Sequence, residues 1–532
     1  MAAAAGGVVA IAALALAGCA GTGGGGGATT GIVTVSSNEP ENPLIPANTN
    51  EVGGGLILNN IMSGLVYYNA DGSVELDDAA SIESDDNQNW TITLRDGLKF
   101  SDGTPVTAES YVKAWQWGAS DPENLNQWWF GYAIPFAGFS DDGGDDTLAL
   151  NVVDDKTFTV ELAQPQADFS LALGYTVFFP LPDSFYDDPA AFGESPIGNG
   201  PYKVAEDGWI HDESITLEPN PEYTGPRTAQ NGGVKMVFYA TQEAAYADLL
   251  SDNLDIIQQV PSNALGTYKD DLGDRAVDQP AAIFQSFTMQ GELPHFGYDE
   301  EGTLRRAAIS HAINREEITD VIFQGTRTPA TDFTSPVIDG YSTDIEGADV
   351  LTYDPEKAVE LWNEANAISP WDGQFGLAYN ADGGHQEWVD ATVNSIKNVL
   401  GIDAVGVPYP DFAGLRTEVN NSTITSAFRT GWQFDYPGMY NILGALYLSG
   451  SGSNDAHYDN PDYDALIAQG AQAGSVDEAN DYFHQAEALL FRDLPAIPLW
   501  YGAVNAGYST AVDNVQYGWD SWPILYKVTK EG

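Results

Sequence analysis

The residues best suited to bind a ligand lie together in one stretch, Gly431-Trp432-Gln433-Phe434-Asp435-Tyr436-Pro437. Gly431 has no Cβ, so the backbone there can come close to a bound molecule. Trp432 and Tyr436 can wall an apolar cavity and still offer a polar group. Between such walls Asp435 would be a poorly hydrated anion, which a cation stabilises. The stretch therefore predicts a site for a cationic group. The alternative is a strand end with core aromatics and a solvated aspartate.

No pattern typical of catalysis accompanies this stretch. The sequence has 6 histidines and neither a His-Glu-x-x-His pair nor a cysteine cluster for a metal. It also lacks a G-x-S-x-G elbow and a Walker-type glycine loop. Carboxylates are so numerous that a pair at glycosidase spacing carries no information. We therefore expect a protein that is not an enzyme, with no catalytic residue, metal or cofactor. A surface hydrolase is the alternative from another class.

The composition indicates a large and strongly acidic protein. A chain of 532 residues is too long for one core, so we expect at least two lobes. The sequence holds 20 basic and 77 acidic residues, which gives a net charge of −57. Such a surface repels nucleic acid and anionic lipid headgroups, so neither is an expected partner. It would also suit a saline habitat, where salt screens the self-repulsion.

The N-terminus predicts export followed by a lipid anchor. The apolar run Val8 to Ala17 is too short to span a bilayer, so we expect residues 1–18 to be a signal peptide. Leu16-Ala17-Gly18-Cys19 resembles a bacterial lipobox, and Cys19 is the only cysteine. We expect Cys19 to be lipidated and residues 19–30 to form a glycine-rich tether. No Lys or Arg precedes the apolar run, and the alternative is a stray Ala/Gly tail.

The rest of the chain alternates predicted strands and helices, which is typical of α/β lobes. Alternating or β-branched residues predict strands at 32–35, 90–95, 234–239 and 404–407. Apolar spacing predicts helices at 56–66, 108–117, 243–250, 387–400 and 481–492. Thr107 and Asp354 are predicted N-caps, the second followed by a proline at the first helical position. The glycines before residue 56 predict a loop, or a backbone against which a ligand can lie.

Several of these segments together resemble the solute-binding proteins of peptide ABC transporters, the oligopeptide/dipeptide-binding family (bacterial extracellular solute-binding protein family 5). The string Phe100-Ser101-Asp102-Gly103-Thr104-Pro105-Val106-Thr107 is the most specific of them. The others are Trp90 to Arg95, Pro196 to Tyr202 with Asn220 to Tyr223, Arg306 to Arg315, Gly431 to Pro437, and Asn460 to Ile467 with Pro495 to Tyr501. They occur in the family's order and cover nearly the whole chain after the tether.

The resemblance implies an α/β fold, a two-lobe periplasmic-binding-protein-like clamshell of the large type II form. Lobe I would comprise residues 31–68, 196–290 and 500–532, with residues 69–195 as an inserted subdomain. Lobe II would comprise residues 291–499. Two crossings, near Met289-Gln290 and near Leu499-Trp500, would form the hinge.

The resemblance also implies the roles of the site residues. Asp435, in a Gly-Trp-x-x-Asp motif with Gly431, Trp432 and Gln433, would pair with the free amine of a peptide. Arg429 aligns with a family arginine near the site. Glu51-Val52-Gly53 would offer an extended edge to the peptide backbone. Tyr436 and Tyr501 complete the predicted peptide-binding set.

The predicted function is that of an extracytoplasmic lipoprotein that captures peptides between two lobes and delivers them to the permease of an ABC importer. We expect a monomer on the outer face of the cytoplasmic membrane. The alternative within the same fold is an oligosaccharide or another small solute, which would not need Asp435. The sequence leaves the length and side-chain preference of the peptide open.

Overall fold

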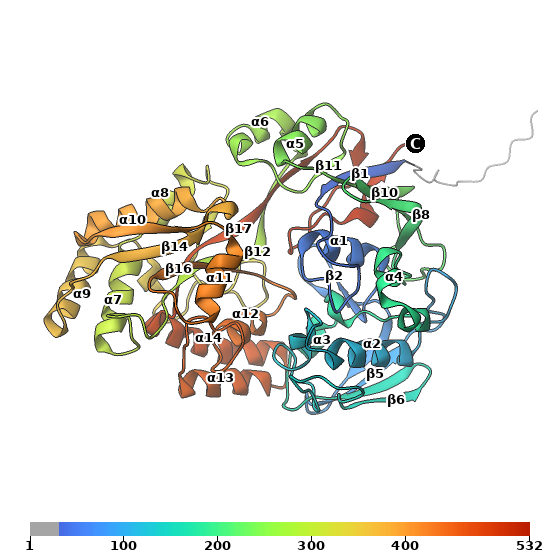
Figure 1. Ribbon diagram of the computed structural model, residues 1–532, viewed down its shortest axis with the longest axis horizontal. Helices are drawn as coiled ribbons and strands as arrows, with labels where there is room; N and C mark the ends of the chain where they lie inside the picture. The colour runs from blue at the N-terminus through green and yellow to red at the C-terminus, as the bar shows by residue number, and fades with distance from the viewer. Residues whose placement is uncertain (1–30) are drawn as a thin grey trace, which may run out of the picture.

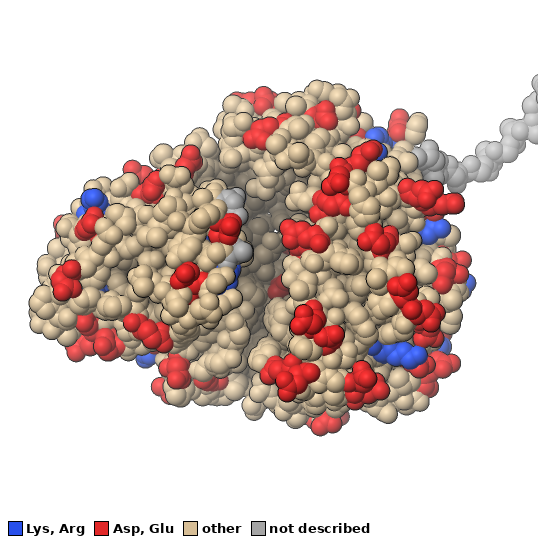
Figure 2. Space-filling view, viewed as in Figure 1, with Lys and Arg blue, Asp and Glu red and all other residues tan. Residues whose placement is uncertain are grey.

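The computed structural model describes residues 31–532. The predicted signal peptide, Cys19 and the glycine tether lie outside the described residues. Two masses of mixed helices and strands stand side by side in Figure 1, and the surface between them is hollowed into a groove in Figure 2. We call the mass that contains the N-terminal strands the first lobe and the other the second lobe.

One sheet of eleven strands passes through both lobes. Its order is β15-β14-β16-β12-β17-β11-β1-β10-β9-β8, and β13 also pairs with β17. The strands of the second-lobe half are β15 (Ala404–Tyr409), β14 (Phe375–Asn380), β16 (Ala427–Gln433) and β13 (Thr328–Pro329). Those of the first-lobe half are β11 (Ile256–Ile257), β1 (Ile32–Ser37), β10 (Gly233–Phe238), β9 (Ser214–Pro219) and β8 (Tyr202–Ile210).

Two long strands, β12 (Ala276–Thr288) and β17 (Ala496–Tyr508), connect the halves as an antiparallel pair. Their register is interrupted between Pro280 and Phe284. Gly502 faces this interruption, and a Cβ on it would lie 2.7 Å from Ile283 Cβ. The irregularity therefore lies several residues before the expected crossing at Met289-Gln290. An interruption of regular pairing is where a two-strand connection bends most easily.

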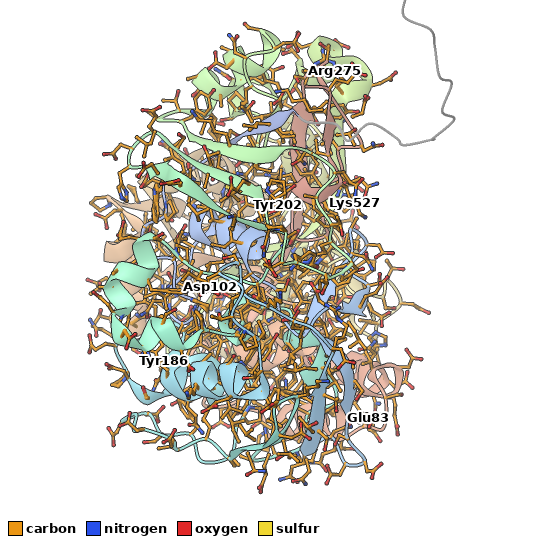
Figure 3. All side chains as sticks on the ribbon, turned by 90° about the vertical axis from the view of Figure 1, so that its right-hand side faces the viewer. Glu83, Asp102, Tyr186, Tyr202, Arg275 and Lys527 are labelled. Atoms are coloured by element: carbon orange, nitrogen blue, oxygen red, sulfur yellow. The ribbon has the colours of Figure 1, made fainter. Side chains whose placement is uncertain are left out.

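The first lobe carries helix α1 (Val52–Ile61) and a separate four-stranded sheet, β4-β5-β7-β6. Thr107 caps α2 (Ala108–Ser120) through a capping box with Ser110. Asp102, labelled in Figure 3, accepts hydrogen bonds from Thr104 in the turn before that helix. The remaining elements are β2 (Val66–Tyr68), β3 (Val74–Leu76), β4 (Ala79–Glu83), β5 (Asn89–Leu94), β6 (Leu150–Asp154), β7 (Thr157–Glu161), α3 (Phe169–Ala172), α4 (Pro189–Glu194), α5 (Gln242–Leu250), α6 (Tyr268–Leu272), β18 (Val512–Asp513) and β19 (Thr529–Lys530).

The second lobe combines β14, β15 and β16 with several helices. In chain order they are α7 (Glu300–His311), α8 (Arg315–Val321), α9 (Pro355–Ile368), α10 (Gln386–Leu400), α11 (Phe412–Asn420), α12 (Tyr440–Tyr447), α13 (Pro461–Ala471) and α14 (Val476–Asp493). Of these helices, α10 and α11 contact β14 and β15. Arg306 on α7 is fully buried and donates to the carbonyl oxygens of Met289 (3.0 Å) and Leu494 (2.9 Å). These carbonyls lie just beyond the end of β12 and just before β17, so Arg306 fixes both connecting strands to the second lobe.

Most predicted elements are present in the structure, and one differs in a way that matters for the site. The glycines predicted as a loop form the first turn of α1. A Cβ on Gly53 would lie 2.8 Å from the Asn38 carbonyl oxygen, and one on Gly55 would lie 3.0 Å from the Trp522 ring. The glycines thus allow close packing of α1 against the protein itself. Within residues 31–532, no helix has both the length and the apolar character needed to cross a membrane.

Candidate functional site

A cavity of about 190 Å³ opens between the lobes, and we call it the cleft cavity. Its second-lobe wall is the end of β16 with the residues after it. Its first-lobe wall comes from α1 with the residues before it and from three other segments. Three carboxylates and several aromatic rings line it, without a lysine or arginine among the lining residues: Thr49, Asn50, Glu51, Val52, Gly55, Asn59, Tyr68, Gly174, Tyr175, Thr176, Gln433, Phe434, Asp435, Trp519, Asp520 and Trp522.

Asp435 follows β16 and is held by Asn441 of α12. The Asp435 backbone N–H donates to Asn441 Oδ1 (3.2 Å), and Asn441 Nδ2 donates to Asp435 Oδ2 (3.3 Å). Trp432 Nε1 donates to the same Asn441 Oδ1 (2.8 Å). Asn441 therefore connects the tryptophan and the aspartate of the predicted motif and fixes the direction of the carboxylate. Tyr175, from the first lobe, also hydrogen-bonds Asp435.

The environment of Asp435 disfavours its negative charge. Burial raises its pKa to about 7, although hydrogen bonds from Asn441 and Tyr175 oppose the shift. Within residues 31–532, Asp435 forms no ion pair with a lysine, arginine or histidine. A cation entering the cleft cavity would replace the lost hydration and restore the ionised form. The carboxylate is thus buried at a cavity without a cationic partner in the described chain.

Glu51 serves α1 directly as its N-cap. Its two carboxylate oxygens accept from the Gly54 backbone N–H at 2.9 and 3.0 Å. Burial raises the pKa of Glu51, and the backbone hydrogen bonds oppose that shift. The expected extended edge at Glu51-Val52-Gly53 is therefore wrong, because an acidic N-cap before the glycines starts a helix there. Glu51 and Val52 still line the cleft cavity, whereas Gly53 lines another cavity with Val52.

Asp520 is a cavity residue that sequence reasoning missed. It lies in a tight turn in which Gly518 N–H donates to the Trp522 carbonyl oxygen (2.7 Å). Burial raises the pKa of Asp520 to about 6. The sequence did contain an indication, because the segment Gly518-Trp519-Asp520-Ser521-Trp522 places a carboxylate between aromatic residues, as the central stretch does. The Asp520 carbonyl oxygen also accepts from Gln433 Nε2 (3.3 Å), which links the two lobes.

Three predicted residues, Arg429, Gly431 and Trp432, line a different cavity of about 220 Å³ in the second lobe. Arg429 Nε donates to Asn380 Oδ1 (2.8 Å), and its guanidinium lies 4.7 Å from the centre of the Phe412 ring. Residues 428–432 of β16 line this cavity, whereas Gln433 at the end of the strand and the two residues after it line the cleft cavity. Asp435 and Arg429 therefore lie at different cavities, separated along the strand.

Tyr436 and Tyr501 were predicted to contact the peptide, but both residues are only about 1% exposed. Tyr436 donates to Asp168 Oδ2 of the first lobe (2.8 Å), so it joins the lobes beside the cavity. The Tyr501 hydroxyl accepts from the backbone N–H groups of Thr331 (3.1 Å) and Asp332 (2.8 Å) and donates to the Asp332 carbonyl oxygen (3.1 Å). Both side chains are committed to contacts within the protein. The described chain also contains no group of three or more His, Cys, Asp or Glu side chains that could hold a metal ion.

Known proteins share both the sequence pattern and the architecture. The family model for bacterial extracellular solute-binding proteins, family 5, matches residues 74–454. The oligopeptide-binding protein OppA of Bacillus subtilis is 26% identical over 494 residues, with 88% of each chain covered. The dipeptide-binding protein DppE of the same organism is 28% identical over 491 residues, with 88% of this chain and 86% of that protein covered.

The fold agrees with that match. The periplasmic binding protein DppA of Helicobacter pylori, solved in complex with the peptide STSA, superposes with a TM-score of 0.76 at 20% identity, covering 95% of this chain and 99% of that one. A two-lobe α/β clamshell is thus shared across a large sequence distance. The expected fold class is confirmed, and the chain belongs to the bacterial extracellular solute-binding proteins of family 5.

Proposed function

We propose that this protein captures peptides with a free amino terminus in the cleft cavity and delivers them to the permease of an ABC importer. The observation that carries the proposal is Asp435, a carboxylate of the interlobe cavity whose charge has no cationic partner within the described chain. Peptide binding in the relatives OppA and DppE supports the same chemistry. Capture requires no bond to be made or broken, which agrees with a family of binding proteins.

Binding follows from the cavity's construction. The ammonium group of the peptide forms a charge-assisted hydrogen bond with Asp435, which Asn441 and Tyr175 hold in place. The lobes then close about the paired strands β12 and β17, whose interrupted register near Pro280 absorbs the rotation. Enclosure removes water and strengthens the ion pair. Peptide side chains meet a lining rich in aromatic rings and small polar groups, which tolerates different sequences.

A direct test is calorimetric titration of the purified protein with a neutral tripeptide such as Ala-Ala-Ala, its N-acetylated form, and a neutral oligosaccharide. We expect the free-amine peptide to bind, the acetylated peptide to bind at least tenfold more weakly, and the sugar not to bind. A sugar that binds more tightly than every peptide tested would favour the alternative within this fold. Release of cleaved peptide during the titration would instead support a hydrolase.

The extracytoplasmic location is proposed on the family match, and the lipid anchor on the sequence around Cys19, which lies outside the described residues. One acyl chain binds membranes only weakly, so stable anchoring calls for more than one chain on Cys19. We expect Cys19→Ser to release the protein from the cell surface into the medium. A variant that stays on the membrane after a high-salt wash would contradict the anchor.

A further inference from the structure

Asp520 lies where the cleft cavity meets a second cavity of about 80 Å³, which we call the adjoining cavity. The adjoining cavity extends into the first lobe toward Asn60, Phe179 and Leu525. The two cavities share part of their lining, so a side chain of a molecule bound in the cleft contacts residues that belong to both. The shared residues are Asn59, Tyr68, Gly174, Trp519, Asp520 and Trp522.

The Asp520 carboxylate has no cationic partner within residues 31–532. It accepts a hydrogen bond from the Trp522 backbone N–H, 3.1 Å from Oδ1, and its other backbone donor is its own N–H. Arg227 also lines the adjoining cavity, but its Nε donates to Asp77 Oδ2 (3.0 Å) and its other nitrogens bind carbonyl and hydroxyl oxygens. The one arginine or lysine among the residues that line the two cavities is therefore already neutralised by another carboxylate.

The turn that carries Asp520 holds its side chain in place. A Cβ on Gly518 would lie 2.3 Å from Asp520 Oδ1, so only glycine leaves room for the carboxylate there. Ser521 adopts a left-handed backbone conformation (φ +75°), and Tyr517 pairs with Pro523 to close the turn. A carboxylate fixed in this way is preorganised and loses little freedom on binding.

The tryptophan side chains beside Asp520 provide a second indication that a ligand binds there. Trp519 is only 2% exposed, yet its indole N–H has no hydrogen-bond acceptor among the described residues, and the buried indole N–H of Trp522 also has none. A buried hydrogen-bond donor without an acceptor destabilises the folded protein. Both indoles line both cavities, so carbonyl groups of a bound ligand can supply the acceptors. The faces of such rings also attract cations.

Asp435, Asp520 and Tyr68 line the same cavity of about 190 Å³. Burial raises the pKa of Tyr68 well above its ordinary value, and the charges of both carboxylates raise it further. In a cavity of this size, a ligand whose amine reaches Asp435 would place its first side chains close to Asp520. The lining offers three carboxylates and no lysine or arginine.

We propose that Asp520 binds a second cation of the ligand, a lysine- or arginine-type side chain at the first or second position, so that the protein prefers peptides with a basic amino end. This inference rests on the proposed function, because Asp435 is taken to hold the amine. The aliphatic part of the basic side chain lies against Tyr68 and the two indoles, and its charged end reaches the Asp520 carboxylate. Glu51, the third carboxylate of the cavity, is held as the N-cap of α1 by the Gly54 backbone N–H, which lies 2.9 and 3.0 Å from its two oxygens.

The test compares lysine with norleucine, which has the same carbon chain and no charge. Calorimetric affinities are measured for Ala-Ala-Ala and for peptides with lysine or norleucine at each of the three positions, using wild type, Asp520→Asn and Asp513→Asn. Asp513 is an exposed carboxylate in the same C-terminal segment, so its variant is the matched control for charge. About 1 M KCl shortens the Debye length to about 3 Å and screens the general attraction of the acidic surface.

The readout is the lysine-to-norleucine affinity ratio within each protein, so a general effect of a substitution on binding cancels. We expect lysine at position one or two to bind wild type and Asp513→Asn at least about tenfold better than norleucine, as a charge-assisted contact predicts. In Asp520→Asn the ratio should fall below about threefold. An unchanged ratio in that variant, or no lysine preference at either position in wild type, would overturn the inference while leaving peptide capture intact. Failure of every peptide to bind wild type would instead reject the proposed function.

Discussion

Asp77 and Asp435 are both carboxylates removed from bulk water, and the protein treats them in opposite ways. Asp77 is fully buried in the first lobe, where Arg227 Nε lies 3.0 Å from its Oδ2. Tyr223 also donates to it at 3.1 Å, and Arg95 lies 3.6 Å from Oδ1. Asp435, in the cleft cavity, has amide and hydroxyl donors but no described cation.

The difference separates a structural carboxylate from one available to a ligand. Burial of an anion is tolerated when the protein supplies the opposite charge, as Arg227 does for Asp77. Arg227 also donates to the Asn59 and Met62 carbonyl oxygens at the end of α1 (2.8 and 3.0 Å), so this pair holds the first lobe together. At Asp435 the described chain supplies no opposite charge, and our proposal assigns that charge to the bound peptide. A shifted pKa without an internal ion pair in a cavity is one basis of that proposal.

The largest expected effect comes from breaking the internal pair. Arg227→Leu leaves Asp77 buried without its nearest cation, so the free energy of unfolding should fall by about 3–5 kcal/mol. Urea denaturation followed by circular dichroism measures it. Lys99→Ala is the control, because Lys99 pairs with Glu222 at 2.7 Å on the half-exposed surface, where such pairs contribute about 0–1 kcal/mol. If the free energy of unfolding fell equally in the two variants, the buried ion pair would contribute no more to stability than the surface pair.

Removing the charge at Asp435 should raise the free energy of unfolding, whereas Arg227→Leu lowers it. Its pKa is about 7 in the folded protein against an ordinary value of 3.8. A raised pKa means that the folded state holds the proton more tightly, so the stability of wild type relative to Asp435→Asn falls as pH rises from about 4 to about 7. We expect the variant to be more stable by about 1–3 kcal/mol at pH 8, after allowance for solvent in the cleft, and equal to wild type near pH 4. Urea denaturation at both pH values tests this, and a less stable variant at pH 8 would give Asp435 a structural role.

The same pKa predicts how peptide binding depends on pH. Below about pH 7 the free protein holds a proton on Asp435 that must leave before an ammonium group can pair with it, so affinity should fall up to tenfold per pH unit. Above about pH 8 the peptide amine loses its own proton, and affinity should fall again. Titration of Ala-Ala-Ala between pH 5 and 9 should therefore show a maximum near neutrality. The Asp520→Asn background removes the other carboxyl of the cavity that titrates near pH 6. A flat profile would show that no ion pair forms.

The sequence was sufficient to predict local elements and a cavity position for Asp435, whose binding role stays a proposal. It was insufficient for features that form where distant segments meet. Thr107 and Asp354 cap their helices as predicted, because capping depends on a few neighbouring residues. Asn441 was not predicted, because its role depends on how the start of α12 turns back toward Asp435. Tyr501 was assigned to the site from its segment alone, whereas its burial depends on the backbone of Thr331 and Asp332.

The place of Asp520 in the cavity was still harder to predict from the sequence. It is 85 residues from Asp435 along the chain, and only the return of the C-terminal segment to the first lobe brings both into one cavity. Its tryptophan neighbours were visible in the sequence, but their burial and the lack of acceptors for their indole N–H groups depend on packing against Tyr68 and α1. Elements could thus be predicted from local chemistry, and the full charge balance of the cavity could not.

The most direct test of the central claim is a cycle that combines Asp435→Asn with N-acetylation of the same peptide, measured by calorimetric titration. If Asp435 holds the amine, each change alone should weaken binding by about ten- to a thousandfold, and the second change should add little to the first. Strong coupling between the two changes is therefore the predicted result. Fully additive losses would contradict the account, because they would show that the carboxylate and the amine do not meet.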